Sequence, residues 1–252
     1  MTLATLFRLD GKRALVTGAG RGLGATIAAA LAAAGAHVTL IARTGDEISQ
    51  VRDDIVERGG AAEATTLDVT NAAAVDAFFA THAPFNVLVN NAGTNRPAPL
   101  VDTTDGDIEV VFNLNVMAAF RMAREVARGL IAARQPGSII NVSSQMGHVG
   151  SVNRTVYCAS KHALEGMTKA LAWELGPHNI RVNSLCPTFI ETPLTAPMLA
   201  KPEFHEWVVG NIALHRVGHE DEVAGPVVFL ASDASSLMTG SALMIDGGWT
   251  AR

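Results

Sequence analysis

Short apolar runs alternate with longer helical patterns along the whole chain. The strand-like runs cover residues 13–17, 37–42, 85–90, 138–143, 180–185 and 242–246, with a weaker run near 65–69. The helical patterns between them cover residues 24–34, 46–58, 72–81, 105–134, 155–175 and 220–231. Near-continuous apolar strands separated by helices are typical of a parallel sheet that is covered on both faces. The alternation therefore predicts an α/β fold built on a doubly wound, seven-stranded parallel sheet with helices on both faces.

One segment departs from this rhythm. Residues 188–211 contain three prolines and several bulky aromatic side chains, namely Pro193, Pro197, Pro202, Phe189, Phe204 and Trp207. We interpret this segment as a lid over a substrate site, with an ordinary surface insertion as the alternative. No Pro-, Gly- or Ser-rich linker divides the chain, and 252 residues suit one large α/β unit, so we expect a single domain over residues 1–252.

Charge and cysteine content exclude several classes of function. The formal net charge is -5 and no basic run occurs, so the chain lacks the electrostatic signature of a protein that binds nucleic acid or an anionic membrane. Two cysteines are too few for a disulfide framework, and the first residues lack the basic and apolar regions of a signal peptide. We therefore expect a cytoplasmic protein that acts on a small molecule.

A glycine-rich turn follows the first expected strand and opens the first expected helix, as Thr17-Gly-Ala-Gly-Arg-Gly-Leu-Gly24. Glycine lets the backbone turn tightly and approach a phosphate group, and the amides at a helix N-terminus favour an anion. The spacing of Gly18, Gly22 and Gly24 differs from the common G-x-G-x-x-G pattern, and Gly20 is additional. The turn predicts a dinucleotide site, with a purely structural strand–turn–helix as the alternative.

The end of the second expected strand indicates which dinucleotide binds. An acidic residue there binds the ribose 2′-hydroxyl of NAD, whereas an arginine accommodates the 2′-phosphate of NADP. Arg43 follows that strand, and Arg21 lies in the glycine-rich turn. Asp46 and Glu47 lie just beyond Arg43 and would weaken the positive field. Because two guanidinium groups can both donate to a phosphate, we favour NADP(H) over NAD(H).

Tyr157 and Lys161 lie four residues apart on an expected helix, so they share one face. A free phenol has a pKa of about 10, too high for proton exchange at neutral pH, and a nearby ammonium group lowers it. Ser143 and Ser144 lie at the end of an expected strand, at the edge where ligands of an open parallel sheet bind. A serine hydroxyl at that edge can hold a substrate oxygen.

Taken together, these motifs resemble those of the short-chain dehydrogenase/reductase family in its single-domain form. The matching segments occur in the family order, as Thr17-Gly-x3-Gly-x-Gly24, Asp68-Val69, Asn90-Asn-Ala-Gly93, Asn115, Ser144, Tyr157-x3-Lys161, Pro187 and Asp246-Gly-Gly248. The resemblance implies a Rossmann-type fold and a catalytic set made of Asn115, Ser144, Tyr157 and Lys161. Ser144 is preferred to Ser143 because it precedes Tyr157 by thirteen residues, the separation typical of the family.

The same resemblance implies the cofactor contacts. Asp68 and Val69 are expected to border the adenine, residues 91–93 to pack along the cofactor, and Thr192 to contact the nicotinamide amide. With the glycine-rich turn, the expected cofactor-binding set is Gly18, Gly20, Arg21, Gly22, Leu23, Gly24, Arg43, Asp68, Val69, Asn91, Ala92, Gly93, Tyr157, Lys161, Pro187, Ile190 and Thr192. The chain departs from the family at Thr188, where glycine is usual, so the loop after Pro187 is expected to differ.

The resemblance also implies the reaction, a hydride transfer between a nicotinamide cofactor and a secondary alcohol or ketone. Segments 145–150 and 186–193 are similar to those of family members that act on sugars, polyols or sugar acids. A 3-oxoacyl-carrier-protein reductase is the main alternative, and it would need a basic docking patch near the entrance. A lyase or epimerase would normally have a longer chain, and a cofactor-binding sensor without turnover would normally lack Tyr157 or Lys161. Family members are commonly homotetramers, paired through the helices at 105–134 and 155–175.

Three further side chains are expected to contact substrate besides Ser144, namely His148, Arg154 and Trp207. A surface role for His148 and Arg154 and a packing role for Trp207 are the alternatives. The remaining histidines show no ligand spacing, so the sequence predicts no catalytic metal.

Overall fold

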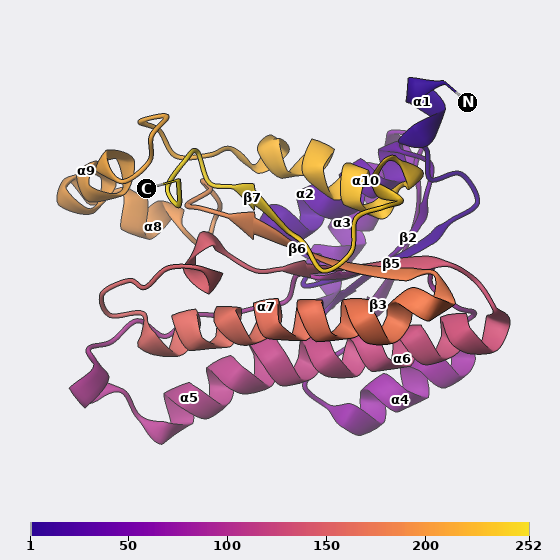
Figure 1. The fold of residues 1–252 in the computed structure, drawn as a ribbon, viewed down its shortest axis with the longest axis horizontal. Coiled ribbons are helices and arrows are strands. Elements are labelled where there is room, and N and C mark those ends of the chain that lie inside the picture. The colour runs from indigo at the N-terminus through magenta and orange to yellow at the C-terminus, as the bar shows by residue number, and fades with distance from the viewer. Residues whose placement is uncertain (1, 252) are drawn as a thin grey trace.

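A seven-stranded parallel sheet with the order β3-β2-β1-β4-β5-β6-β7 runs through the middle of the protein (Figure 1). We describe residues 2–251 of a computed structural model. The strands are β1 Arg13–Thr17, β2 His37–Ala42, β3 Ala61–Thr66, β4 Val87–Asn90, β5 Gly137–Val142, β6 Ile180–Pro187 and β7 Ala242–Ile245. The chain winds outward from β1 in one direction and from β4 in the other. The predicted doubly wound parallel sheet is therefore confirmed.

Helices cover both faces of the sheet (Figure 1). One face carries α2 Gly22–Ala33, α3 Gly45–Glu57 and α10 Ala224–Ala231, and the other carries α4 Ala72–Thr81, α5 Asp105–Phe112, α6 Ala119–Ala133 and α7 Thr155–Leu175. The shorter helices are α1 Leu3–Leu6, α8 Ala196–Leu199, α9 Pro202–Gly210, η1 Leu100–Asp102, η3 Gln145–Gly147, η4 Gly176–His178, η5 Glu220–Val223 and η6 Asp233–Ser235. A π-helix, η2 Asn113–Ala118, joins α5 to α6.

Alternate residues of the central strands bury into two separate cores. Val16 of β1 belongs to the core beneath α2 and α10, while its neighbour Leu15 belongs to the core beneath α4 and α6. This separation follows from the two-residue period of a strand, which points successive side chains to opposite faces. Helix α2 contributes Ala28 and Leu31 at 0% exposure, and its small residues let it pack closely on the sheet.

The expected strand at 65–69 is wrong, because β3 runs over Ala61–Thr66. This edge strand consists of small and polar residues and is only partly buried, so no apolar run marks it. The apolar residues that suggested the later position, Leu67 and Val69, follow the strand and pack into the core beneath α4 and α6. A second difference is that the expected helix at 105–134 contains the π-helix η2.

The carboxyl ends of the parallel strands all lie at one edge of the sheet, and β1 and β4 are neighbours there. The glycine-rich turn follows β1, residues 91–94 follow β4, residues 143–148 follow β5 and residues 188–211 follow β6. Ligands of open α/β sheets bind in the crevice at such a reversal of strand order. None of the helices in the described residues is both long enough and apolar enough to cross a bilayer.

Candidate active site

The glycine-rich turn is held by the end of β4. The side-chain amide of Asn91 donates to the carbonyl oxygens of Thr17 at 2.9 Å and of Gly18 at 3.1 Å, and Thr17 Oγ1 accepts from the backbone amides of Asn91 and Ala92. Gly18 has φ 65, a conformation that favours glycine. A Cβ on Gly24 would lie 2.1 Å from the Gly18 carbonyl oxygen, so only glycine fits there.

The N-terminus of α2 suits the phosphates of a dinucleotide. The first turn of α2 contains no acidic residue, and no side chain caps it, so its amide groups stay available for an anion. Thr192 lies across from this turn, 3.7 Å from the position that a Cβ on Gly22 would take. The structure thus brings the expected contacts Gly18, Gly22, Gly24 and Thr192 together around one cradle. These residues fit a dinucleotide cofactor.

The two candidate arginines for a 2′-phosphate are both exposed, but they differ in their partners. Arg21 Nη1 lies 3.4 Å from Glu47 Oε1, an exposed ion pair. Arg43 lies near Asp68, whose pKa is lowered mainly by hydrogen bonds from Thr70 and further by the Arg43 charge. Val69, expected at the adenine, follows β3 and packs its side chain into the core beneath α4 and α6.

Tyr157 and Lys161 lie on one face of α7, as their spacing predicts. Lys161 is 5% exposed, its Nζ atom donates to the Val142 carbonyl oxygen at the end of β5 at 2.8 Å, and the same atom is 5.5 Å from the centre of the Tyr157 ring. Burial raises the pKa of Tyr157 to about 12, while a hydrogen bond with Ser144 acts to lower it. Burial also lowers the pKa of Lys161 to about 8, while the nearby Cys186 and Glu165 act to raise it.

Ser144 follows β5 and faces Tyr157, whereas the Ser143 hydroxyl faces the Cys186 sulfur. The Ser144 hydroxyl donates to Gln145 Oε1 at 2.6 Å and accepts from the Met146 amide at 3.1 Å. Gln145 is a site residue that the sequence pattern did not predict. The one available signal was the run of three polar residues, Ser143 to Gln145, that follows an apolar strand. It is 1% exposed, and its Nε2 atom has no hydrogen-bond partner.

Asn115 lies in the π-helix η2 and is 1% exposed. Its side chain accepts from the Thr94 amide at 2.8 Å and donates to the Thr94 carbonyl oxygen and to Ser160 Oγ, both at 3.0 Å. Ser160 in turn donates to the Tyr157 carbonyl oxygen. A Cβ on Gly93 would lie 3.3 Å from Asn115 Oδ1 and 3.8 Å from Lys161 Nζ, so both side chains meet beside this glycine. Asn115 thus connects the loop after β4 to the catalytic helix.

Residues of the segment 188–211 pack against Tyr157. Helices α8 and α9 of this segment contribute to an apolar cluster in which Phe189 and Val208 pack with Met146 and Tyr157. Trp207 is 42% exposed and lies against Phe189, Phe204 and Trp249, so it forms part of the aromatic cluster of this segment.

The other two expected substrate residues, Arg154 and His148, have different surroundings. Arg154 caps α7 and is partly buried, with Nη2 3.8 Å from Met198 Sδ of α8. His148 follows the short helix η3, and its imidazole faces Cys186 of β6. Thr188, where the family pattern has glycine, lies with Ile190 in a shallow pocket that is also lined by Gly218 and Gly247.

Fold and site together define a Rossmann-type oxidoreductase that depends on a nicotinamide cofactor. A family model described as enoyl-(acyl carrier protein) reductase matches residues 18–250. The L-xylulose reductase of Bos taurus is 39% identical over 244 residues, which cover 97% of this chain and 98% of that protein. The gluconate 5-dehydrogenase of Gluconobacter oxydans is 36% identical, with 99% of each chain covered.

A solved structure gives the same result. The gluconate 5-dehydrogenase of Burkholderia cenocepacia, in complex with NADP and tartrate, superimposes with a TM-score of 0.94 at 34% identity and 100% coverage of both chains. The chain belongs to the short-chain dehydrogenase/reductase family.

Proposed function

We propose that this protein interconverts a secondary alcohol and a ketone in a small sugar, polyol or sugar acid, and that it prefers NADP(H) as cofactor. The observation that carries the reaction is the placement of Ser144, Tyr157 and Lys161 around one point at the carboxyl edge of the sheet. Relatives named for xylulose and gluconate support the substrate class.

In the reductive direction, Tyr157 donates its proton to the substrate oxygen, and in the oxidative direction it accepts that proton. The phenol is protonated at neutral pH because burial holds its pKa at about 12. Ser144 donates a hydrogen bond to the same substrate oxygen, which stabilises the charge that develops there. Lys161, fixed by the Val142 carbonyl, favours the phenolate that remains after transfer. When bound, the nicotinamide cofactor supplies or accepts the hydride.

Tyr157→Phe tests this scheme, because it removes one oxygen atom and keeps the ring that packs against the lid. We expect kcat to fall by about 10²–10⁴-fold, the usual contribution of a positioned acid or base, with cofactor binding and thermal unfolding retained. The assay follows nicotinamide absorbance with a panel of ketoses, polyols and sugar acids. A folded Tyr157→Phe variant with normal turnover would overturn the assignment.

Buried polar atoms without partners support a hydroxyl-rich substrate. Asn95 Oδ1, Gln145 Nε2 and Thr188 Oγ1 have no hydrogen-bond partner, and they follow the carboxyl ends of β4, β5 and β6. Such groups are costly to leave unpaired and are satisfied by a ligand with matching hydroxyls.

The half-buried Arg154 is the cation placed to bind a carboxylate. We expect Arg154→Gln to raise KM for sugar acids at least tenfold more than KM for uncharged ketoses.

An acyl carrier protein as substrate carrier is disfavoured by the charge of the lid. Residues 188–211 carry three glutamates and one lysine, the opposite of the basic docking patch that such a carrier needs. We expect kcat/KM for a short acyl thioester to be far below that for the preferred sugar. A carrier-linked substrate that outperforms every sugar in the panel would replace this proposal.

The preference for NADP is proposed from Arg21 and Arg43. We expect Arg43→Ala to lower kcat/KM for NADP(H) by about 10–100-fold and to leave that for NAD(H) within about twofold, since it removes a charge-assisted contact to the 2′-phosphate. Arg58→Ala is the matched control, because Arg58 is an exposed arginine at the far end of α3. If Arg43→Ala leaves the ratio of kcat/KM for NADP(H) to kcat/KM for NAD(H) unchanged, Arg43 does not bind the 2′-phosphate.

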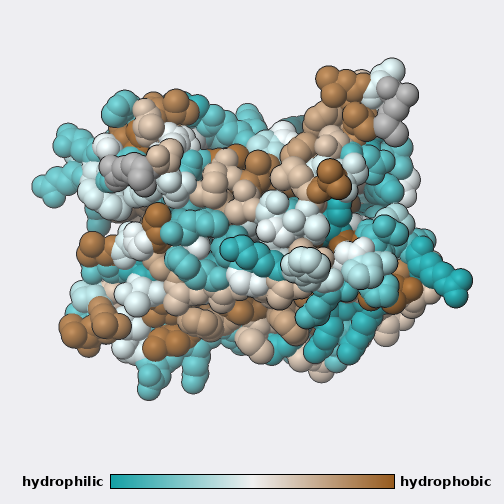
Figure 2. Space-filling view, in the orientation of Figure 1, coloured by the Kyte–Doolittle hydropathy of each residue, from teal (hydrophilic) through white to brown (hydrophobic). Residues whose placement is uncertain are grey.

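We also propose that the protein forms homotetramers through the α5, α6 and α7 layer. Val110, Met117, Phe120 and Trp173 are between 46% and 87% exposed on this layer. Figure 2 shows hydrophobic surface gathered over the lower part of the molecule, where these helices lie. Light scattering of the purified protein tests the assembly, and we expect Phe120→Asp to reduce it.

The two cysteines are buried and unpaired, which supports a reducing compartment such as the cytoplasm.

A further inference from the structure

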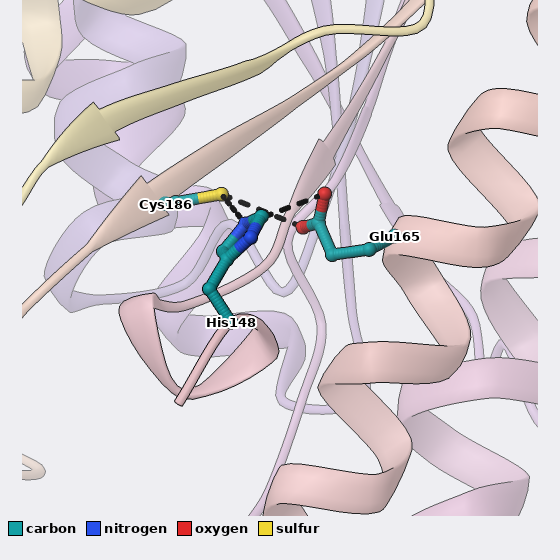
Figure 3. Close-up of side chains that lie close together, drawn as sticks. All are labelled: His148, Glu165 and Cys186. Atoms are coloured by element: carbon teal, nitrogen blue, oxygen red, sulfur yellow. Dashed lines mark hydrogen bonds and ion pairs between the residues drawn. The ribbon is translucent and has the colours of Figure 1, made fainter. Parts of the chain in front are cut away.

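Three potential metal ligands from distant parts of the chain converge behind the catalytic lysine. His148 lies in the turn after η3, Glu165 lies on α7 one turn beyond Lys161, and Cys186 lies on β6 (Figure 3). Glu165 is 6% exposed and Cys186 is 0% exposed, so a carboxyl group and a thiol meet inside the protein. His148 keeps 30% of its side chain exposed and provides a path from solvent.

We propose that His148, Glu165 and Cys186 form a binding site for one Zn²⁺ ion. The donor atoms are an imidazole nitrogen, a carboxylate oxygen and a sulfur, a set that suits zinc and related transition metals rather than Mg²⁺ or Ca²⁺. The site does not depend on which substrate the enzyme takes.

The three donor groups lie close enough to surround one ion, with one ligand atom from each residue within 4.8 Å of the other two. Cys186 Sγ is 3.6 Å from His148 Nε2 and 3.4 Å from Glu165 Oε1, whereas His148 Nε2 is 3.6 Å from the other carboxylate oxygen, Oε2. Zinc bonds of about 2.3 Å to sulfur and about 2.0–2.1 Å to nitrogen or oxygen place tetrahedral ligand atoms roughly 3.3–3.6 Å apart. Zinc binding would turn the Glu165 carboxylate so that one oxygen faces both His148 and Cys186, and would draw the three side chains together from their 4.8 Å span.

A fourth polar group lies beside the three ligands. Ser143 is 3% exposed, and its hydroxyl lies within hydrogen-bonding reach of the Cys186 sulfur. Ser143 Oγ and Glu165 Cγ lie 2.9 Å and 3.2 Å from the position that a Cβ on Gly147 would take, so the glycine keeps the space between them open. A hydroxyl in this position can donate a hydrogen bond to the zinc-bound thiolate, as outer partners of zinc ligands commonly do.

Charge and orientation also favour the ion. Binding replaces the S–H bond of Cys186 with a sulfur–zinc bond, and the displaced proton leaves to solvent, so nothing is oxidised or reduced. The thiolate and the carboxylate then neutralise the two positive charges of the ion inside the protein. Ser184 Oγ donates to Glu165 Oε2 at 2.8 Å and fixes the carboxylate, as outer partners of zinc ligands commonly do.

The sequence alone did not indicate this site, and its pattern led us to expect no metal. His148 and Cys186 are 38 residues apart, and each ligand lies on a different element, so no short spacing marks them. They meet because β5 and β6 are adjacent strands and α7 packs against β6.

The test uses the full-length protein without an affinity tag, freed of metal with a chelator. Zinc binding is measured by competition with a chromophoric chelator, and Co²⁺ is used as an optical probe because thiolate ligation gives an intense charge-transfer band. We expect one high-affinity zinc per chain, a cobalt–thiolate band, and no competition from excess Mg²⁺.

Three variants test whether these side chains are the zinc ligands. Cys186→Ser and His148→Asn should each remove the cobalt–thiolate band or weaken zinc binding by more than about 100-fold, since even outer partners of zinc ligands change affinity by about 10–100-fold. Cys158→Ser is the matched control and should bind like the parent, because Cys158 lies outside the cluster. His148 lies in an exposed turn, so His148→Asn keeps the test decisive if Cys186→Ser fails to fold. Equal binding by His148→Asn and the parent, or no stoichiometric binding by the parent, would overturn the proposal.

Discussion

At the proposed cofactor site the backbone of α2 packs closely against the backbone of the glycine-rich turn, and Gly24→Ala tests this close packing. The added methyl group would lie 2.1 Å from the Gly18 carbonyl oxygen and 2.6 Å from Asn91 Nδ2. Neither neighbour can rotate away, because one is backbone and the other holds the turn through hydrogen bonds to Thr17 and Gly18. Helix α2 must therefore move away from β1.

The expected magnitude follows from two opposing effects. Overpacking against groups that cannot rotate away costs up to about 3 kcal/mol, while alanine gains up to about 1 kcal/mol over glycine in a helix, so the net loss is about 2 kcal/mol. For a chain of this size that loss lowers the melting temperature by about 4–8 °C.

The assay is thermal unfolding followed by circular dichroism at equal protein concentration, with Gly166→Ala as the control. Gly166 is an exposed residue in the interior of α7, and a Cβ there meets nothing within 4 Å. The same substitution at Gly166 should leave the melting temperature unchanged or raise it by up to about 4 °C. If Gly24→Ala melts with the parent, or the two variants move together, the packing argument at the turn is refuted.

Three further outcomes are expected. Ser144→Ala should lower kcat by about 10²–10³-fold through loss of one donor to the substrate oxygen, and steady-state kinetics of a folded variant measure it. Tyr157 is the single tyrosine, so phenolate absorbance reports it alone, and its midpoint in the cofactor-free protein should lie near 12. The protonated phenol contributes its full stability below about pH 10, and this contribution is lost as the pH rises towards 12, because Tyr157 loses its proton at a lower pH in the unfolded chain than in the folded protein. A phenolate midpoint near pH 10 in the folded protein would contradict the burial of Tyr157. Glu47→Gln should lower KM for NADP by freeing Arg21 from its ion pair, and an unchanged KM would show that Arg21 does not contact the phosphate.

Most of the fold could be predicted because its elements carry strong local patterns. The bounds of β1, β2, α4 and α7 agree with the sequence-based expectation, since apolar runs and helical periodicity mark them directly. The edge strand β3 could not be placed, because an edge strand of small and polar residues has no apolar run and forms only through pairing with β2. Tertiary pairing decides such elements, and a local pattern does not record it.

The same distinction between local pattern and tertiary pairing applies to the residues of the site. Tyr157 and Lys161 could be paired from sequence, because four residues along a helix place two side chains on one face. Gln145 and the group around Glu165 could not, because their burial and their partners depend on strands that are distant in sequence and adjacent in the sheet. The packing of the Val69 side chain into the core could not be predicted either, because it depends on the neighbouring helices α4 and α6.

The π-helix that presents Asn115 places stability and activity in opposition at one position. A π-turn holds one more residue than a regular helical turn, is rare, and is commonly found at functional sites. Deleting one residue from Asn113–Ala118 would allow a continuous α-helix from α5 through α6, which is the more favourable local structure, but the Asn115 amide would rotate away from Thr94 and Ser160. Selection for heat resistance alone would therefore tend to convert this segment to a regular α-helix and lower turnover. Selection for catalysis would preserve the π-helix.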